Sequence, residues 1–311
     1  MSETVAAIDC GTNSIRLLLA GPGQDGQALS DVDRRTEIVR LGQGVDATGE
    51  FHPDALARTF ARTEEYAQEI RAAGVPPERT RFVATSAARD AGNREEFFAG
   101  VEARLGVRPE IISGDEEARL SFAGALSRVR PAAGPVLVVD IGGGSTELIV
   151  GSVGGVLASA ISLDVGSVRV TERFLKVGPP DPADLDRATR YVDDLLDGSG
   201  VDFAAVGTWI GVAGTATTLA GVHLRLAAYD REQVHGTTIP QQDLADLLTL
   251  LSRMTVDQIK ALPSMHPGRA DVVTAGALIA RRIGVRLDVP GMLVSESDIL
   301  DGIALELLRR D

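Results

Sequence analysis

The stretches AAIDCGTNSIRLLLAG (residues 6–21) and LVVDIGGGSTELIVGS (residues 137–152) repeat one pattern. In each copy a hydrophobic run ends in an aspartate, Asp9 or Asp140, passes through a turn of small residues and resumes as an apolar strand. Glycine in such a turn permits positive φ values and a close approach of the backbone to an anion. The repeat predicts two similar halves, each with a hairpin turn of backbone N–H groups, and the two turns are expected to converge on one cleft and bind a chain of phosphates.

The two turns and their flanking acids supply the candidate ligands. The predicted phosphate-binding residues are Gly11, Thr12, Asn13, Ser14, Gly142, Gly143, Gly144 and Ser145. Three carboxylates, Asp9, Asp140 and Glu147, are the candidate ligands of a hydrated divalent cation, either directly or through water. The alternative is a pair of ordinary capped hairpin turns with solvated carboxylates, and the duplication favours the functional interpretation.

Size and composition are those of a soluble protein with two domains. The chain has 311 residues, which exceeds the usual size of one core, and 44% of them are hydrophobic and 24% charged. No apolar stretch reaches the roughly 18 residues of a membrane span, and the N-terminus lacks the features of a signal peptide, so we expect a cytoplasmic protein without membrane contact. The net charge of −13 argues against a nucleic-acid-binding surface. It does not exclude a phosphate-rich ligand, because arginines and cations inside a site determine its local charge.

The order of predicted elements indicates an α/β protein. Residues 5–41 predict three strands, and residues 136–163 repeat that plan before further strands and helices alternate. We expect an N-terminal domain at 1–127 and a C-terminal domain at 128–296. A final helix at about 297–311 is expected to pack back on the first domain.

Two local signals define details of the first domain. Its third strand is expected at TEIVRL (36–41), after a turn at GPGQDG (21–26). Asn93 is expected to cap a helix over 94–106, with Glu96 completing a capping box.

A catalytic base is expected among three consecutive acids, Asp115, Glu116 and Glu117, which stand between a predicted strand and a predicted helix. Acidic residues favour the first turn of a helix, which explains Asp115 and Glu116. One of three successive residues at this turn must point inward, and we expect it to be Glu117. A carboxylate that faces a phosphate-lined cleft can accept a proton from water and orient the water for attack.

A phosphate-binding arginine is the other catalytic candidate. Arg89 follows a strand of small residues in ATSAARDAGN (84–93), a position from which a side chain can reach a ligand at the end of a strand. Guanidinium groups bind phosphate oxygens in a bidentate manner. The alternative is an ordinary surface arginine. A P-loop with its lysine is excluded, because the chain has no G-x-x-x-x-G-K-[ST] motif.

Seven motifs in order resemble the Ppx/GppA family of exopolyphosphatases and guanosine pentaphosphate phosphohydrolases. They are DCGTNSIRLL, ATSAARDAGN, IISGDEEARLSFAG, VVDIGGGSTELIVG, GVAGTATTLAG, VHG and GRADVVTAGALI, and they extend over essentially the whole chain. The resemblance implies the fold shared by actin, heat-shock chaperones and sugar kinases (the ASKHA type), in which two ribonuclease-H-like domains surround a central cleft.

The resemblance also implies roles for individual residues. Glu117 matches the catalytic base, and Arg89 matches the arginine on the terminal phosphate. Asp140 and Glu147 match acids near a magnesium site, while Asn13, Ser14 and the run Gly142, Gly143, Gly144 and Ser145 match the phosphate loops. The implied reaction is Mg²⁺-dependent hydrolysis of the terminal phosphoanhydride of inorganic polyphosphate, with Mn²⁺ as the alternative metal.

Other functions remain open at the level of sequence. Guanosine pentaphosphate is the alternative substrate for the same chemistry, and a small-molecule kinase or a non-catalytic polyphosphate or nucleotide sensor are the alternatives of another class. A homodimer is suggested by the resemblance alone.

Two departures limit the resemblance. Long members carry further C-terminal helical domains, whereas this chain stops after the two core domains, so we expect a preference for short polyphosphate. Where many relatives have arginine before an acid and a glycine, this chain has Leu300, Asp301 and Gly302, so no basic contact is carried over there.

Overall fold

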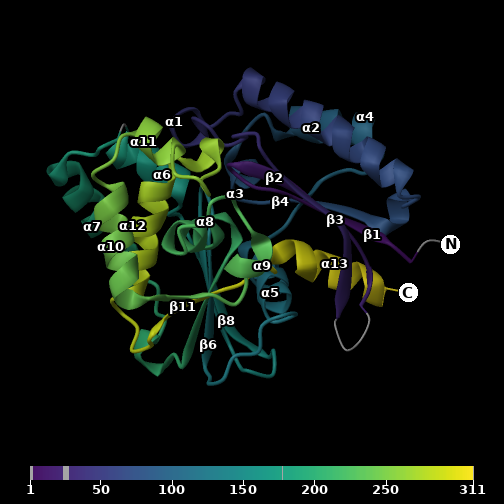
Figure 1. Ribbon diagram of the computed structural model, residues 1–311. Helices are drawn as coiled ribbons and strands as arrows, with labels where there is room; N and C mark the ends of the chain where they lie inside the picture. Colours follow the sequence, from purple (N-terminus) through teal and green to yellow (C-terminus); the bar gives the residue numbers. More distant parts are fainter. Residues whose placement is uncertain (1–2, 24–27, 177, 311) are drawn as a thin grey trace. The chain divides into compact units, whose positions relative to one another are not determined.

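A computed structural model describes residues 3–23, 28–176 and 178–310 (Figure 1). Contacts between α-carbons divide the chain into two compact units. Unit 1 comprises Met1–Arg128 and Ser297–Asp311, and unit 2 comprises Val129–Glu296. In the part of the chain that the structure describes, no helix combines the length and the apolar composition that crossing a membrane requires.

Unit 1 is built on a five-stranded mixed sheet in the order β3-β2-β1-β4-β5. The strands are β1 (Val5–Cys10), β2 (Ser14–Pro22), β3 (Leu29–Ile38), β4 (Thr80–Ala84) and β5 (Glu110–Ile111). The first three strands are antiparallel, whereas β4 runs parallel to β1 and β5 runs parallel to β4.

Unit 2 repeats this topology in a sheet ordered β10-β11-β9-β6-β7-β8. Its strands are β6 (Val136–Ile141), β7 (Thr146–Gly151), β8 (Leu157–Leu163), β9 (Thr208–Val212), β10 (Thr238–Pro240) and β11 (Gly291–Val294). An antiparallel β6-β7-β8 meander is followed by β9 and β11 in parallel, and β10 adds an antiparallel edge. The predicted α/β class and the duplicated ribonuclease-H-like topology are therefore confirmed.

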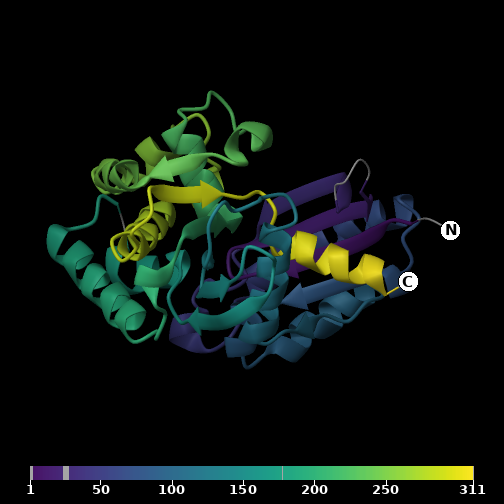
Figure 2. The same ribbon diagram turned by 90° about the horizontal axis from the view of Figure 1, so that it is seen from below.

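Helices cover both faces of the sheet of unit 1. They are α1 (Val45–Thr48), α2 (Pro53–Ala72), α3 (Ser86–Asp90), α4 (Arg94–Leu105), α5 (Gly114–Ala125) and α13 (Ile299–Arg309), with a 3₁₀ turn at Pro77–Arg79. Side chains alternate between the faces of a strand, so Ile8 of β1 packs in the α2 and α4 cluster while Ala7 packs in the α5 and α13 cluster. Figures 1 and 2 show α13 of this unit running beside α5. Asp9 continues the alternation of Ala7 and thus points to the face of α5 and α13.

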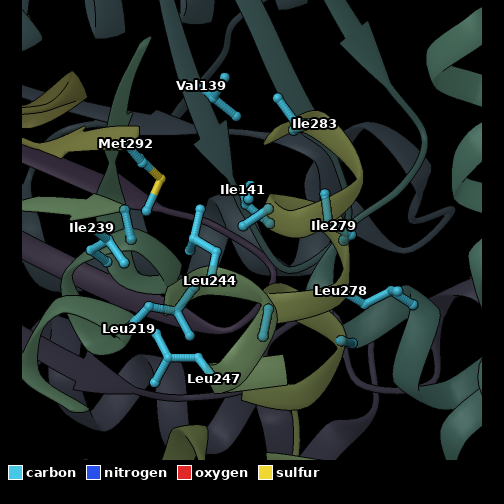
Figure 3. Packing of buried hydrophobic residues seen from close by; sticks show 14 of the residues in the cluster. Val139, Ile141, Leu219, Ile239, Leu244, Leu247, Leu278, Ile279, Ile283 and Met292 are labelled. Atoms are coloured by element: carbon cyan, nitrogen blue, oxygen red, sulfur yellow. The ribbon is translucent and has the colours of Figure 1, made fainter. Parts of the chain in front are cut away.

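A large apolar core lies in unit 2 (Figure 3). The helices of this unit are α6 (Ser167–Val170), α7 (Pro182–Asp197), α8 (Ala213–His223), α9 (Arg231–Val234), α10 (Gln241–Leu251), α11 (Val256–Lys260) and α12 (Val273–Gly284). A π-helical stretch follows α6 at Thr171–Leu175, and 3₁₀ turns lie at Phe203–Ala205 and Pro267–Arg269. Val139 and Ile141 of β6 point into the core beside Ile279 and Ile283 of α12. Asp140, between them in sequence, therefore points to the other face of the sheet.

The third strand differs from its prediction. It spans Leu29–Ile38 rather than 36–41, and it pairs with β2 along its whole length. Its first seven residues, LSDVDRR, are strongly charged, so its extended structure depends on pairing with β2 rather than on local hydrophobicity. Of the predicted turn at 21–26, residues 24–26 lie outside the described residues.

The predicted capping box of α4 is wrong. Asn93 occupies the N-cap position but its side chain makes no capping bond. Instead its Oδ1 accepts a hydrogen bond from the Phe51 N–H at 2.8 Å, and its Nδ2 donates to the Phe51 carbonyl at 3.1 Å. The Asn93 side chain therefore makes a tertiary contact with Phe51 instead of capping the helix.

Candidate functional site

The first predicted turn in unit 1 is a closed hairpin of four residues. Cys10 lies opposite Ile15, and the Gly11 N–H donates to the Ser14 carbonyl at 3.0 Å. The Gly11 amide is thus used within the turn, so the phosphate-binding prediction for this turn depends on the amides of the following residues.

The loop that follows β3 binds this turn through backbone hydrogen bonds. The Asn13 carbonyl accepts hydrogen bonds from the N–H groups of Val39 and Arg40, at 3.1 and 2.9 Å. Because C=O and N–H point in opposite directions across a trans peptide, these bonds direct the Ser14 N–H away from the loop. The Thr12 hydroxyl lies 3.0 Å from the Ser86 hydroxyl, which joins the turn to the start of α3.

A partly buried arginine neutralises the aspartate beside this turn. Asp9 lies opposite Arg16 on the β1–β2 ladder, and Arg16 donates to its Oδ2 through Nε at 3.0 Å and through Nη2 at 2.6 Å. The same guanidinium also contacts the Asp298 carboxylate at the N-cap of α13. Although burial favours the neutral form, Arg16 and Arg34 hold the pKa of Asp298 below its ordinary value.

The hydrogen-bond network around Arg16 was not predicted from the sequence, although the pairing of Arg16 with Asp9 could have been found. A four-residue turn between Cys10 and Ile15 fixes the register, and that register places Arg16 opposite Asp9. No local signal links Arg16 to Asp298, because the two are far apart in sequence and meet only in the folded unit.

Glu117 is buried and faces Arg89 within unit 1. The Ser113 hydroxyl caps α5, which begins at Gly114 and places Glu117 in its first turn with 6% of its surface exposed. Arg89 of α3 donates from Nη1 to Glu117 Oε2 at 2.9 Å and to the Ile112 carbonyl at 3.1 Å. Burial raises the pKa of Glu117 to about 7, although the Arg89 charge opposes this shift. A carboxylate with a pKa near neutrality can exchange a proton with water at the pH of a cell.

The other two acids at this turn point elsewhere. Asp115 is exposed, and Glu116 accepts a hydrogen bond from Arg81 at 2.6 Å. Of the three successive carboxylates, Glu117 is the one directed into the unit, as expected from its place in the turn. Asp9 and Arg16 both act on the pKa of Glu117, so the structure brings Asp9, Arg89 and Glu117 into one electrostatic neighbourhood.

The second predicted turn, in unit 2, has the same backbone closure. Ile141 lies opposite Thr146, and the Gly142 N–H donates to the Ser145 carbonyl at 3.0 Å. As in unit 1, the first amide is used inside the turn. The amides of Gly143, Gly144 and Ser145 carry the phosphate-binding prediction here.

Two carboxylates lie opposite one another beside the second turn. Asp140 pairs with Glu147 on the β6–β7 ladder, so both point to the face away from the apolar core, and both are buried. Ser162 on β8 donates to Glu147 Oε1 at 2.8 Å, which fixes that carboxylate. Carboxylate oxygens on neighbouring strands are hard donors of the kind that Mg²⁺ and Mn²⁺ bind.

The donor set fits a cation that keeps other ligands. Among the described residues no cluster of three or more histidine, cysteine, aspartate or glutamate side chains could hold a metal. Mg²⁺ is usually bound through one or two carboxylates together with water and substrate phosphates, so the Asp140 and Glu147 pair suffices for it. A fully protein-coordinated structural metal does not fit these residues.

The segment that departs from the resemblance has a different role. Leu300 of α13 is 1% exposed and packs in the apolar cluster between α13, α5 and the sheet. The neighbouring Asp301 accepts a hydrogen bond from Arg34 of β3 at 2.7 Å, so its basic partner comes from a strand of the same unit.

Comparison with known proteins now identifies the family. The model of the Ppx/GppA phosphatase family matches residues 23–311. This chain belongs to the Ppx/GppA phosphatase family. The family resemblance stated from the motifs is confirmed, and membership places the chain among the phosphoanhydride hydrolases.

One named relative and two solved structures align with this chain over nearly their full length. Exopolyphosphatase 2 of Mycobacterium tuberculosis is 46% identical over 316 residues, which cover 97% of this chain and 98% of the relative. The crystal structure of an exopolyphosphatase-like protein has a TM-score of 0.92 at 41% identity and covers 99% of each chain. The crystal structure of the Aquifex aeolicus Ppx/GppA family member has a TM-score of 0.82 at 31% identity, covering 99% of this chain and 98% of that one.

Proposed function

We propose that this protein is an exopolyphosphatase that hydrolyses the terminal phosphoanhydride of inorganic polyphosphate. The observation that carries the proposal is the buried Glu117 with its pKa of about 7, held at 2.9 Å by Arg89. Membership in a phosphatase family and 46% identity to a protein named as an exopolyphosphatase support the choice of substrate.

Glu117 is proposed as the general base of the reaction. It accepts a proton from water while the water oxygen forms a bond to the terminal phosphorus. The phosphorus–oxygen bond to the rest of the chain breaks, and the leaving phosphate takes the bonding electron pair. The products are orthophosphate and a polyphosphate chain shorter by one unit.

Arg89 is proposed to bind the terminal phosphate while it holds Glu117. A guanidinium has five N–H donors in a fixed fork, so the Nη1 bonds to Glu117 and Ile112 leave further donors for phosphate oxygens. In phosphoryl transfer, positioning and electrostatic stabilisation provide most of the catalysis. Arg89 would therefore align the base and the phosphorus with one side chain.

The backbone turns are proposed to bind phosphate oxygens in each unit. In unit 1 the donors are Thr12, Asn13 and Ser14, and in unit 2 they are the amides of Gly143 to Ser145. The sequence duplication supports the idea that each turn binds phosphate oxygens. Substitutions in either turn should then raise the KM for polyphosphate.

A divalent cation, Mg²⁺ or alternatively Mn²⁺, is proposed to be held by Asp140 and Glu147. When bound, it supplies positive charge that neutralises phosphate oxygens. Asp9 would contribute through water, because its carboxylate is already paired with Arg16 at 2.6 Å.

The substrate assignment is tested by a panel of phosphate donors. Phosphate release is measured as kcat/KM for tripolyphosphate, for longer polyphosphate and for guanosine pentaphosphate, with and without Mg²⁺. The proposal expects polyphosphate to be preferred, and a higher kcat/KM for guanosine pentaphosphate would overturn the substrate. The preference for short chains stays a prediction that the same panel decides.

The same panel separates hydrolysis from the other classes. Transfer of phosphate from ATP to a metabolite rather than to water would indicate a kinase. Tight binding of tripolyphosphate without phosphate release under Mg²⁺ would indicate a sensor. The homodimer stays a prediction, which light scattering of the purified protein would test.

A further inference from the structure

A short segment after β8 binds the back of the second turn. The N–H of Ser167 and its hydroxyl donate to the Gly142 carbonyl at 2.9 and 3.2 Å. The N–H groups of Val168 and Arg169 donate to the Gly143 carbonyl at 2.9 and 3.1 Å. The first residues of α6 thus bind two successive carbonyls of the glycine turn through the backbone.

The third carbonyl of the turn is held by a side chain. Arg169 donates from Nε to the Gly144 carbonyl at 2.8 Å. The carbonyl of Gly144 is therefore bound by the α6 segment, as the carbonyls of Gly142 and Gly143 are, but through a guanidinium instead of a backbone amide.

These bonds determine where the amides of the turn point. In a planar trans peptide the N–H of one residue points opposite to the C=O of the residue before it. With the carbonyls of Gly142, Gly143 and Gly144 bound to the α6 segment, the amides of Gly143, Gly144 and Ser145 are directed away from it. These three amides are the ones proposed to bind phosphate. The Arg169 bond governs the peptide between Gly144 and Ser145.

The approach of the two segments is unusually close. A Cβ on Gly166 would lie 2.4 Å from the Gly143 carbonyl oxygen, a separation that real Cβ atoms essentially never show. The segment is therefore packed against the turn through bare backbone. A run of glycines has great conformational freedom, so an external support of this kind restricts peptide rotation.

We propose that Arg169 is a positioning residue that sets the orientation of the Gly144–Ser145 peptide and so presents the Ser145 amide to phosphate. The inference rests on the proposed function for its kinetic readout, because it assigns a support to the same phosphate-binding turn. Arg169 acts here through the donor at Nε rather than through its charge on the substrate.

Three substitutions separate the donor from the charge. Arg169→Gln puts an N–H donor at the same place along the side chain as Nε and removes the charge. Arg169→Lys keeps the charge but puts a methylene group at that place. Arg169→Met removes both while it keeps the length of the side chain up to that atom.

The expected order follows from the hydrogen bond. Loss of the donor should raise the KM for tripolyphosphate roughly tenfold, with kcat changed far less, because a support for ground-state binding is removed. We expect the KM of Arg169→Gln to remain closest to that of the wild type, and Arg169→Lys to resemble Arg169→Met. A KM for Arg169→Lys closer to the wild type than that of Arg169→Gln would show that the charge contacts the substrate, and would overturn the proposal.

Arg173 provides a matched control on the same helical segment. Its Nη1 donates to the Tyr191 hydroxyl at 2.9 Å. Arg173→Gln removes the same positive charge from a position close to Arg169 in the sequence. We expect the KM and kcat of this variant to remain within about twofold of the wild type, as for most surface substitutions. An equal rise of KM in Arg173→Gln and Arg169→Met would indicate a general charge effect and contradict the inference.

Hydrogen exchange tests the support without any substrate. Deuterium uptake of a peptide covering residues 141–146 should be faster in Arg169→Met than in wild type, and near the wild-type rate in Arg169→Gln. Unchanged uptake in Arg169→Met would overturn the positioning role even if phosphate release fell. Conversely, if the wild type released no phosphate from polyphosphate, the proposed function would fail while the exchange result still decided the inference.

Discussion

The turn Gly11–Ser14 of unit 1 and the turn Gly142–Ser145 of unit 2 have the same backbone hydrogen bond but differ in the charge of the residues beside them. Each is closed by a 3.0 Å hydrogen bond from its first amide to its last carbonyl. Each follows an aspartate, but the residue opposite that aspartate is Arg16 in unit 1 and Glu147 in unit 2. Arg16 neutralises Asp9, whereas Glu147 adds a second carboxylate beside Asp140. The comparison teaches that a single cross-strand residue changes the charge beside a duplicated turn. Under the proposed function, this residue suits the turn of unit 1 to an anion alone and the turn of unit 2 to an anion with a cation.

The largest effect should come from Glu117, the proposed base, which lies in unit 1. Glu117→Gln removes a proton acceptor but keeps the shape of the side chain and a partner for Arg89. Loss of a general base typically costs about 10²–10⁴ in rate, and we expect kcat for polyphosphate to fall by this amount. Asp115→Asn on the same turn is the matched control, since Asp115 is exposed, and its kcat should stay near the wild-type value.

The pH dependence sharpens the same assignment. Because the pKa of Glu117 is raised to about 7, kcat/KM should fall as the pH drops below about 7, where the base becomes protonated. The sign for stability is opposite: the folded state binds this proton more tightly than the unfolded state, so the contribution of Glu117 to stability declines as the pH rises from about 4.5 to about 7. An activity profile without a limb near neutrality, or full activity in Glu117→Gln, would remove Glu117 from the role.

The next largest effect concerns the charge difference between the two turns. Arg16→Met leaves Asp9 and Asp298 buried without the guanidinium that joins them, and breaking a buried ion pair costs about 3–5 kcal/mol. Urea unfolding should show this loss in unit 1. In unit 2 the corresponding change is Glu147→Gln, which without metal should leave stability unchanged or increase it, because it removes a carboxylate facing Asp140. Equal destabilisation by both variants would contradict the charge comparison.

Acid titration checks the unit 1 side of this comparison. Since the pKa of Asp298 is lowered in the folded state, its contribution to stability is present above its ordinary value of 3.8 and is lost as the pH falls through the folded value. The stability gap between wild type and Asp298→Asn should therefore close in acid. A gap that persisted below this range would show that the residue acts through packing and not through its charge.

Metal dependence is the third test of the comparison. Glu147→Gln should raise the Mg²⁺ concentration for half-maximal activity by roughly tenfold or more, since changes around a metal commonly cost 10–100-fold in affinity. Asp9→Asn should raise it less, because Arg16 already occupies that carboxylate. Equal shifts for the two variants would contradict the assignment of the cation to the Asp140 and Glu147 pair.

Local and long-range features were not equally predictable from the sequence. The duplicated strands, their turns and the inward direction of Glu117 follow from patterns within a few residues, and the structure has each of them. Asn93 followed a local capping motif, yet its side chain binds Phe51, which no pattern around Asn93 signals. The charged first seven residues of β3 likewise depend on their partner strand.

The hydrogen bonds that hold the candidate site residues in place were not predicted from the sequence. Arg16 meets Asp298, and Arg169 meets Gly144, only after the chain has folded. Hydrogen bonds between such distant residues leave no periodicity in the sequence. A hairpin register can recover a cross-strand pair such as Asp9 and Arg16, but not a third partner from another element.

The smallest expected effect tests whether β8 contributes to the cation pair of unit 2. Ser162 lies opposite Glu147 and donates to its Oε1 at 2.8 Å, so Ser162→Ala removes one hydrogen bond from a proposed metal ligand. We expect the half-saturating Mg²⁺ concentration to rise about three- to tenfold with kcat preserved, as for loss of one typical hydrogen bond. Ser159→Ala is the control on the same strand, because Ser159 lies opposite Val150 and should leave the Mg²⁺ requirement unchanged. Unit 1 has arginine at the position of Glu147, so it needs no such support. An unchanged Mg²⁺ requirement in Ser162→Ala would therefore place the cation away from Glu147 and remove the proposed difference between the two turns.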